Sequence, residues 1–165
     1  MEIRPYEPGD AEGLWDCKRA FELDLGSGTG GDGKQAKYEG KLDAGYREAW
    51  FDWVARCVDA DPRCVTVAVE ADADTTTVAG YVFVLPESHR FIWDAAVLNE
   101  IYVAPDHRGT GVADDLMDAA VDLAQDQDLP LDRLVLDVDR KNDRAGAFYE
   151  RHGFEHWGEM VAREL

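Results

Sequence analysis

A strand, a glycine-containing turn and an amphipathic helix that Pro130 ends follow one another from residue 95 onward. The apolar run AAVLNEIYV over 95–103 predicts a strand, and Pro105 then turns the chain. Beyond Gly111 the apolar residues recur at helical spacing, which predicts a helix with one buried face over Val112, Leu116, Ala119 or Ala120, and Leu123. A strand that leads into such a helix constrains the chain to a layered α/β fold, because each element must cover the other.

The turn within this unit carries a basic residue and two glycines, in the order Arg108, Gly109, Thr110, Gly111. The first N–H groups of a helix have no partner inside the helix, and the helix dipole makes them a ready anion site. Glycines would let a phosphate approach the main chain, and Arg108 would add a charge-assisted hydrogen bond. The same residues are equally consistent with a tight turn in which the glycines serve geometry alone.

The rest of the chain reads as alternating helices and strands. "EIRPY" predicts a short N-terminal strand, and "CVTVAVE" and "VAGYVFVLP" predict a hairpin. Further strands are expected over 133–138 and, as an edge strand, over 154–165, with helices over 10–25, 45–60 and 142–152. The fold class is therefore mixed α/β, with a mostly antiparallel sheet. We expect one domain over residues 1–165 with a flexible glycine-rich loop at 26–34.

The net charge of −18, from 35 acidic and 17 basic residues, argues against a nucleic-acid partner. A cationic substrate or a salt-adapted surface would each explain the acidity. The even spread of the acids favours the salt-adapted surface. No apolar run is long enough to span a membrane, and the N-terminus has no signal-peptide pattern, so we expect a cytoplasmic protein with no membrane partner. A homodimer is left open.

Metal and nucleotide motifs are weak in this chain. The three cysteines form no CxxC pair, and neither they nor the four histidines show metal-ligand spacing, so no metal site is expected. The segment 26–34 imitates both G-x-G-x-x-G and a phosphate loop. It follows a predicted helix where both motifs need a strand, and Gln35 replaces the Ser or Thr of a phosphate loop. We interpret it as a surface loop, with nucleotide binding as the competing reading.

Two motifs together decide between the readings of the glycine turn. "LNEIYVAPDHRGTGVADDLM" resembles the signature strand, loop and helix of the GNAT superfamily of acyl-CoA-dependent N-acyltransferases, whose pattern Q/R-x-x-G-x-G/A is matched by Arg108, Gly111 and Ala113. "NDRAGAFYERHGF" resembles the family's second motif. The resemblance covers residues 95–156, and it implies a GNAT-like sheet with helices on both faces and a splayed parallel strand pair.

The resemblance also implies a binding site for acetyl-CoA within 95–156. The pantetheine arm would bond the backbone of Ile101, Tyr102 and Val103 and the side chain of Asn142. The diphosphate would lie on the loop of Arg108, Gly109, Thr110, Gly111, Val112 and Ala113. Residues 1–94 would form the half that holds the acceptor. Asp114 and Asp115 depart from the basic or small residues that the family often carries there, and we expect them to point outward.

The resemblance makes Tyr149 the group that protonates the departing thiolate, which suits a phenol that is neutral at working pH. Its alternative role is a core aromatic. Glu100 is the candidate base for the amine, with Asn99 on the opposite face of the strand. A salt-bridged Glu100 and a proton path through water are the alternatives.

The sequence thus predicts an acyl-CoA-dependent acetyltransferase that acetylates a primary amine of a small molecule or peptide by direct attack in a ternary complex. No Cys or Ser is placed as a covalent relay. The alternative function is a non-catalytic acyl-CoA-binding or regulatory module on the same fold.

Overall fold

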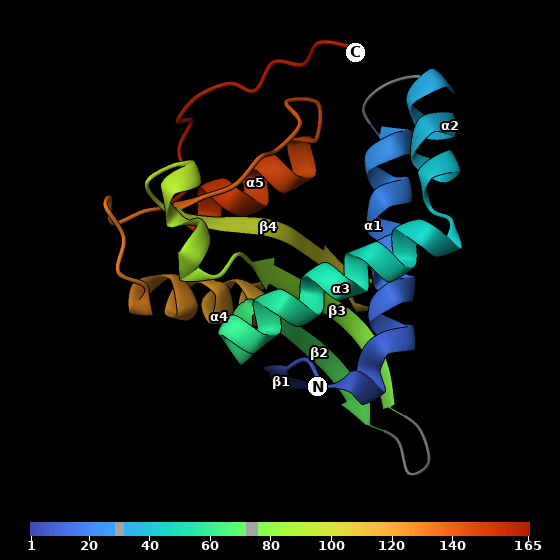
Figure 1. The fold of residues 1–165 in the computed structure, drawn as a ribbon, viewed down its shortest axis with the longest axis horizontal. Coiled ribbons are helices and arrows are strands. Elements are labelled where there is room, and N and C mark those ends of the chain that lie inside the picture. Colours follow the sequence, from blue (N-terminus) through green and yellow to red (C-terminus); the bar gives the residue numbers. More distant parts are fainter. Residues whose placement is uncertain (29–31, 72–75) are drawn as a thin grey trace.

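A computed structural model describes residues 1–28, 32–71 and 76–165. Within these ranges five strands form one sheet in the order β1-β2-β3-β4-β5 (Figure 1). The strands are β1 (Glu2–Pro5), β2 (Val65–Ala71), β3 (Thr76–Val84), β4 (Ala96–Val103) and β5 (Leu134–Val135). The helices are α1 (Ala11–Gly28), α2 (Asp32–Lys41), α3 (Ala44–Ala60), α4 (Val112–Asp126) and α5 (Asp143–Arg151).

The sheet is mostly antiparallel, as predicted. β1 pairs with β2, β2 with β3 and β3 with β4, and all three pairs are antiparallel. β4 and β5 pair in parallel through only two residue pairs, Ala96 with Leu134 and Val97 with Val135. Beyond Val97 no described strand lies beside this edge of β4. The predicted mixed α/β class with a splayed parallel pair is therefore confirmed.

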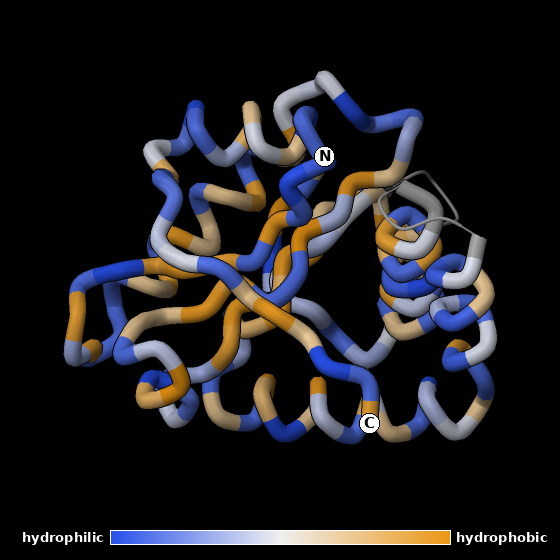
Figure 2. The backbone as a smooth tube through the Cα atoms, turned by 90° about the horizontal axis from the view of Figure 1, so that it is seen from above, coloured by the Kyte–Doolittle hydropathy of each residue, from blue (hydrophilic) through white to orange (hydrophobic). Residues whose placement is uncertain are grey.

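Helices cover both faces of the sheet. Neighbouring residues of a strand point to opposite faces, and every residue of β3 from Val78 to Val84 is buried. Trp53 of α3 lies with its ring centroid 4.8 Å from that of Phe83. Figure 1 shows α3 in front of the sheet and α4 behind it, and the view from above places helical segments on both sides of the strands (Figure 2). The buried face of α4 includes the predicted Val112, Leu116, Ala120 and Leu123.

Two glycines permit close contacts that hold these layers together. A Cβ on Gly80 of β3 would lie 2.6 Å from the carbonyl oxygen of Tyr102 in β4. A Cβ on Gly13 of α1 would lie 2.7 Å from the Val78 side chain. Real Cβ atoms do not approach other atoms this closely. Glycine at these positions therefore sets how near β4 and α1 come to β3.

The glycine-rich segment is helical where the structure describes it. α1 continues through Gly28 and α2 begins at Asp32, so the loop expected at 26–34 is wrong for 26–28 and 32–34, and residues 29–31 lie outside the described residues. At Gly26 a Cβ would lie 3.1 Å from the Tyr38 side chain. This glycine serves the close packing of two helices, which the sequence pattern alone does not distinguish from a turn.

One predicted strand is also shorter than expected, and another does not form. The strand over 133–138 reduces to Leu134–Val135, because β5 pairs with β4 only there. Residues 154–165 contain no regular element, so the predicted edge strand is wrong. Their apolar side chains include Trp157, Met160 and Val161, all exposed. An alternating pattern forms a strand only where a neighbouring edge supplies hydrogen bonds, and β5 offers two residues.

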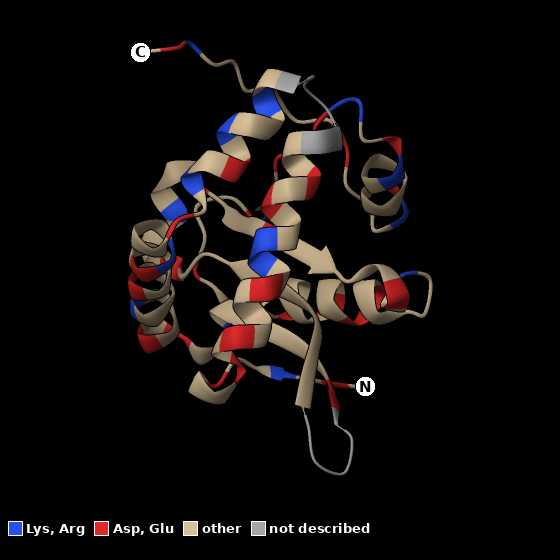
Figure 3. Cartoon of the chain, turned by 90° about the vertical axis from the view of Figure 1, so that its right-hand side faces the viewer, with Lys and Arg blue, Asp and Glu red and all other residues tan. Residues whose placement is uncertain are grey.

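The acidic side chains are distributed over the helices rather than gathered at one point (Figure 3). The cysteines Cys17, Cys57 and Cys64 are free and buried, as expected of structural thiols. Burial raises the pKa of Cys17 and of Cys64 to about 12. No helix among residues 1–28, 32–71 and 76–165 has the length and apolar character needed to cross a membrane.

Gly80→Ala is expected to destabilise the protein by about 1–3 kcal/mol, because the added methyl group would collide with a backbone oxygen that has little room to move. Urea unfolding followed by circular dichroism measures this loss. Gly40→Ala in α2 is the matched control, since a Cβ there meets nothing within 4 Å. Equal stability of the Gly80 variant and the wild type would contradict the close approach.

Candidate functional site

The turn between β4 and α4 exposes a series of backbone N–H groups. Gly109 has a φ of +79° and Gly111 a φ of +95°, and Gly111 is the N-cap of α4. Within the described residues, the amides from Gly109 to Ala113 donate to no other backbone group and to no side chain. A Cβ at either glycine would meet open space. The positive φ values therefore require glycine, and the amides are available to an external anion.

Arg108 is held beside this loop by two protein groups. Its Nε donates to the carbonyl oxygen of Val103 at 2.8 Å, and its Nη2 donates to Asp24 of α1 at 3.0 Å. Its guanidinium also lies 5.6 Å from the Tyr102 ring centroid. The sequence predicted a phosphate contact for Arg108. The structure instead shows it tying the end of β4 to α1, so the phosphate contact stays a prediction.

The outer edge of β4 carries open peptide groups beside this loop. The amide of Ala104, the residue after β4, donates to the carbonyl of Ala79, which lies directly opposite in β3. In an antiparallel pair, the peptide groups of every second residue bond the neighbouring strand, and the peptide groups of the residues between them point to the other edge. By this alternation the peptide groups of Ile101 and Val103 face the outer edge. The carbonyl of Val103 accepts the Arg108 bond, while no described strand pairs with Ile101 on that side. The edge thus presents the donors and acceptors that an extended amide-containing ligand requires.

α5 brings the second motif to the same end of the sheet. Asn142 caps α5, with its side-chain oxygen accepting from the amide of Ala145 at 3.1 Å. This leaves its amide NH₂ group as a donor. Asp114, in the first turn of α4, accepts from Arg151 at 2.5 Å and lies 2.8 Å from His152 Nε2. These contacts lower the pKa of Asp114, the Arg151 hydrogen bond most, and they fasten the end of α5 to the glycine loop.

Tyr149 lies in α5 between other aromatic side chains. Its ring centroid is 5.5 Å from that of Phe148 and 5.7 Å from that of Phe154. Its hydroxyl makes no hydrogen bond with the described residues. Burial raises the pKa of Tyr149 to about 12, so the phenol carries its proton throughout the physiological range. An unengaged, protonated hydroxyl suits a proton donor, and its ring contacts equally suit a core aromatic.

Glu100 is buried, and both its carboxylate oxygens are engaged. Oε1 lies 2.5 Å from Lys18 Nζ, and Oε2 accepts from the Tyr81 hydroxyl at 2.6 Å. Asn99 was expected on the opposite face, and it is exposed where Glu100 is buried. Its Nδ2 nevertheless donates to Glu100 Oε1 at 3.2 Å, next to a register shift at Phe83 and Val84 that leaves Asn99 without a partner residue in β3. The salt-bridged state of Glu100 is the one that the structure contains.

The ion pair of Glu100 belongs to a larger buried network. Lys18 Nζ also lies 2.6 Å from Glu22 Oε1, four residues along α1. Glu22 Oε2 lies 2.6 Å from Lys41 of α2. Burial lowers the pKa of Lys18, but the ion pairs outweigh this effect and the net shift is upward. For Glu22, burial raises the pKa and the two lysines reverse the shift.

Sequence reasoning found Glu100 but missed its partners Lys18 and Tyr81, and it missed Glu22 and Lys41, which extend the network. One indication was present in the sequence. Lys18 and Glu22 follow the apolar Leu14 at intervals of four residues, so all three lie on the same, buried face of α1. An opposite-charge pair on a buried helix face indicates a polar network rather than a solvated surface. The link to Tyr81 and Lys41 needed the tertiary structure.

A family model for the Acetyltransferase (GNAT) family matches residues 32–154. This span contains the β4 edge, the glycine loop and α5. The chain belongs to the GNAT acetyltransferase family. The resemblance of the two sequence motifs is thereby confirmed, while a salt-adapted origin stays a prediction.

One relative and two solved structures illustrate the family. Mycothiol acetyltransferase of Kocuria rhizophila is 31% identical over 163 residues, which cover 95% of this chain and 46% of that protein. The chain thus spans about half the length of this relative. Ribosomal-protein-alanine N-acetyltransferase from Brucella melitensis superposes with a TM-score of 0.68 at 22% identity, over 96% of this chain and 86% of that one.

The second structure is AAC(6')-Iy in complex with the bisubstrate analogue CoA-S-monomethyl-acetylneamine. It superposes with a TM-score of 0.61 at 17% identity, over 99% of this chain and 97% of that one. At these identities the likeness establishes the fold. GNAT acetyltransferases use acetyl-CoA, and the open amides and open strand edge of this chain fit a ligand with a diphosphate and peptide-like bonds.

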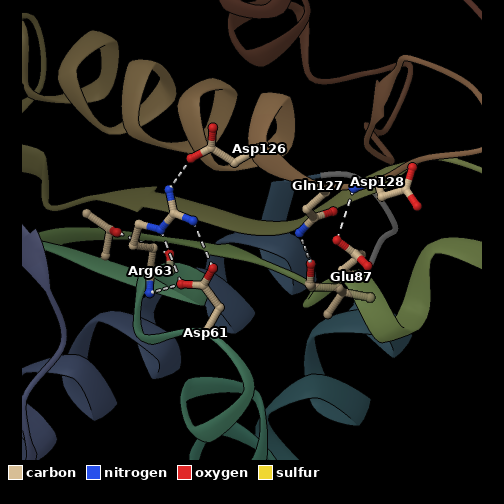
Figure 4. A network of polar contacts seen from close by, with 8 residues as sticks. Asp61, Arg63, Glu87, Asp126, Gln127 and Asp128 are labelled. Atoms are coloured by element: carbon tan, nitrogen blue, oxygen red, sulfur yellow. Dashed lines mark hydrogen bonds and ion pairs between the residues drawn. The ribbon is translucent and has the colours of Figure 1, made fainter.

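A second polar cluster lies at the far end of α4 (Figure 4). Arg63 donates to Asp61 at 3.0 Å and to Asp126 at 2.6 Å, and Glu87 accepts from the amide of Asp128 at 3.0 Å. These groups line a pocket of about 280 Å³. α4 has 15 residues, so roughly 20 Å separate this cluster from the glycine loop. It fastens the end of α4 to neighbouring turns and lies outside the candidate site.

Lys18→Met is expected to lower the free energy of unfolding by about 3–5 kcal/mol, because it leaves two buried carboxylates, Glu22 and Glu100, without their shared cation. Chemical unfolding measures the effect. Arg19→Met, the adjacent exposed position on α1, is the control. Adding Glu100→Gln to Lys18→Met should recover part of the loss, and a Lys18 variant as stable as the control would disprove the role of the ion pairs.

Proposed function

We propose that this GNAT protein transfers an acetyl group from acetyl-CoA to a primary amine by direct attack in a ternary complex. The observation that carries the proposal is the run of open backbone groups from the outer edge of β4 into the amides from Gly109 to Ala113. These groups suit the amide arm and the diphosphate of one extended ligand. Acetyl-CoA would supply the activated thioester.

The proposed cofactor contacts use these open groups. The amides at the start of α4 would bind the diphosphate, aided by the helix dipole. The outward peptide group of Ile101 would bond the pantetheine arm, and the free NH₂ of Asn142 would donate to it from the other side. Arg108 would give up its hydrogen bond to Asp24 and donate to a phosphate oxygen instead. Asp24 is exposed to solvent, so this bond is the easier of its two hydrogen bonds to exchange.

Tyr149 would donate a proton as the thiolate leaves. A thiol has a pKa of about 8.5 and a phenol of about 10, so the tyrosine is neutral at working pH and can stabilise developing charge on sulfur. Burial raises its pKa further, to about 12, which keeps the proton in place. Removing the hydroxyl leaves the ring contacts with Phe148 and Phe154 intact.

The amine must lose its proton before attack. At neutral pH this costs about 4.6 kcal/mol for a lysine-like amine and about 1.4 kcal/mol for an α-amino group. Glu100 is the candidate base, and its bonds with Lys18 and Tyr81 would have to loosen for it to accept a proton. A proton path through water avoids that rearrangement, and it suits an amine of low pKa.

The locked Glu100 is also the observation that favours a second candidate, a non-catalytic acyl-CoA-binding module. Such a module would bind acetyl-CoA in the same place and release no thiol with any amine. A screen of amine acceptors that follows free CoA thiol separates the two functions. Cytoplasmic location, a salt-adapted surface and a homodimer stay predictions.

Thr110→Glu is expected to weaken acetyl-CoA binding about tenfold or more relative to Thr110→Gln, because only the Glu variant sets a charge against the diphosphate. Thr110 is exposed, and both variants lose the same hydrogen bond to the carbonyl of His107. Calorimetry with acetyl-CoA measures the difference, which should shrink at high salt. Stabilisation by ATP or NAD in place of acetyl-CoA, or equal affinity of the two variants, would argue against the site.

Tyr149→Phe is expected to lower kcat about 100-fold on an acceptor found in the screen, while the KM for acetyl-CoA stays within about threefold. The rate of the wild type should not fall through tyrosine ionisation below pH 10, since the pKa of Tyr149 is about 12. Phe148→Leu, which alters the neighbouring ring, is the control for packing. An unchanged rate in Tyr149→Phe would remove the proton-donor role.

A further inference from the structure

The ammonium group of Lys41 lies in a site built from a carboxylate and two aromatic rings. Its Nζ is 2.6 Å from Glu22 Oε2, 4.4 Å from the Tyr38 ring centroid and 5.4 Å from the Tyr46 ring centroid. We call Glu22, Tyr38 and Tyr46 the Glu22 cage. A carboxylate flanked by aromatic faces is the chemistry that recognises organic ammonium ions.

The two partners of this ion pair differ in their freedom. The side chain of Glu22 is 5% exposed and that of Lys41 is 38% exposed. Glu22 Oε1 is held by Lys18 at 2.6 Å and by the Tyr46 hydroxyl at 3.3 Å. Glu22 is therefore held by buried contacts, while Lys41 sits on a long, partly solvated side chain that can turn toward water when another ammonium takes its place.

The second oxygen of Glu22 is poorly satisfied. Oε2 is buried, and Lys41 Nζ lies 2.6 Å from it without the alignment of a well-directed hydrogen bond. A buried carboxylate oxygen with a poorly directed partner is costly. A ligand ammonium that approached with better alignment would gain what the lysine leaves unused.

The cage is connected to the proposed site. Lys18 bridges Glu22 and Glu100, at 2.6 Å and 2.5 Å. Glu100 directly precedes Ile101, whose peptide group faces the outer edge of β4. One buried ammonium thus separates the cage from the strand along which the acetyl donor is proposed to lie. The net charge of −18 further favours the approach of a polycation.

We propose that the Glu22 cage binds the second cationic group of the acceptor, and that Lys41 is a place-holder which this group displaces. This inference rests on the proposed function. It assigns the acceptor to the class of amines that carry another positive charge a few bonds from the reacting nitrogen, such as aliphatic diamines. A monoamine of the same length would leave Lys41 in the cage.

The test uses 1,4-diaminobutane as the probe and calorimetry on the full chain. Lys41→Met empties the cage of its competing ammonium and is expected to bind the probe at least tenfold more tightly than the wild type. Lys41→Arg retains a cation and should bind as the wild type does. Lys37→Met removes the same charge from the same helix and is the matched control. The Lys37 side chain is 72% exposed and pairs with Glu164, away from the cage, so this variant should also bind the probe as the wild type does.

Lys41→Met and Lys37→Met with equal affinity for the probe would overturn the cation site, and thermal melts of each variant exclude misfolding as the cause. With an active preparation, Lys41→Met should lower the KM for 1,4-diaminobutane and leave that for n-butylamine unchanged; equal changes for both amines would also overturn it. Binding of acetyl-CoA is measured on the same samples. Tight probe binding without acetyl-CoA binding would reject the proposed function and retain the cation site, whereas the reverse result would reject the cation site alone.

Discussion

The open outer edge of β4 is the constraint on which the rest of the site depends. β5 pairs with β4 at Ala96 and Val97 and then separates from it. Where no neighbouring strand pairs with an edge inside a protein, the N–H and C=O groups of that edge need other hydrogen-bond partners. Here the end of that edge is bonded by Arg108, and the amides of the following loop remain open. The gap between two parallel strands therefore leaves peptide groups of β4 available for hydrogen bonds, and these groups would determine which ligand could bind along the strand.

A buried ammonium group couples this strand to the helical half of the molecule. Lys18 is shared by Glu22 and Glu100, and Lys41 reaches Glu22 from α2, so that two ammonium groups balance two carboxylates. Such pairs contribute little net stability, since burying charges costs much of what their attraction returns. What they supply is position. The carboxylate of Glu100 is fixed beside β4, and the two helices that would face an acceptor are joined to it through charge rather than through apolar contact alone.

Glycine has three different roles in this chain, and only one of them could be recognised from its neighbours. Gly111 adopts a positive φ at the start of a helix, and the strand and helix patterns on either side of it predict this turn. Gly80 allows two strands to approach, and Gly26 allows two helices to approach. The last two were invisible as packing positions because the residue that each one meets is distant in the sequence.

The sequence by itself determined the strand over 95–103, the glycine turn and the helix that follows it and, through them and the second motif, the family, because strand alternation, helical spacing and the glycine turn are local patterns. The helices over 45–60 and 142–152 and the hairpin were likewise predictable. Tertiary structure alone decided that α2 is a helix, that β5 shrinks to two residues and that residues 154–165 form no strand. It also decided that Glu100 meets Lys18, 82 residues away. Each of these outcomes depends on contacts with segments that are distant in the sequence, and the residues next to a position carry no information about such contacts.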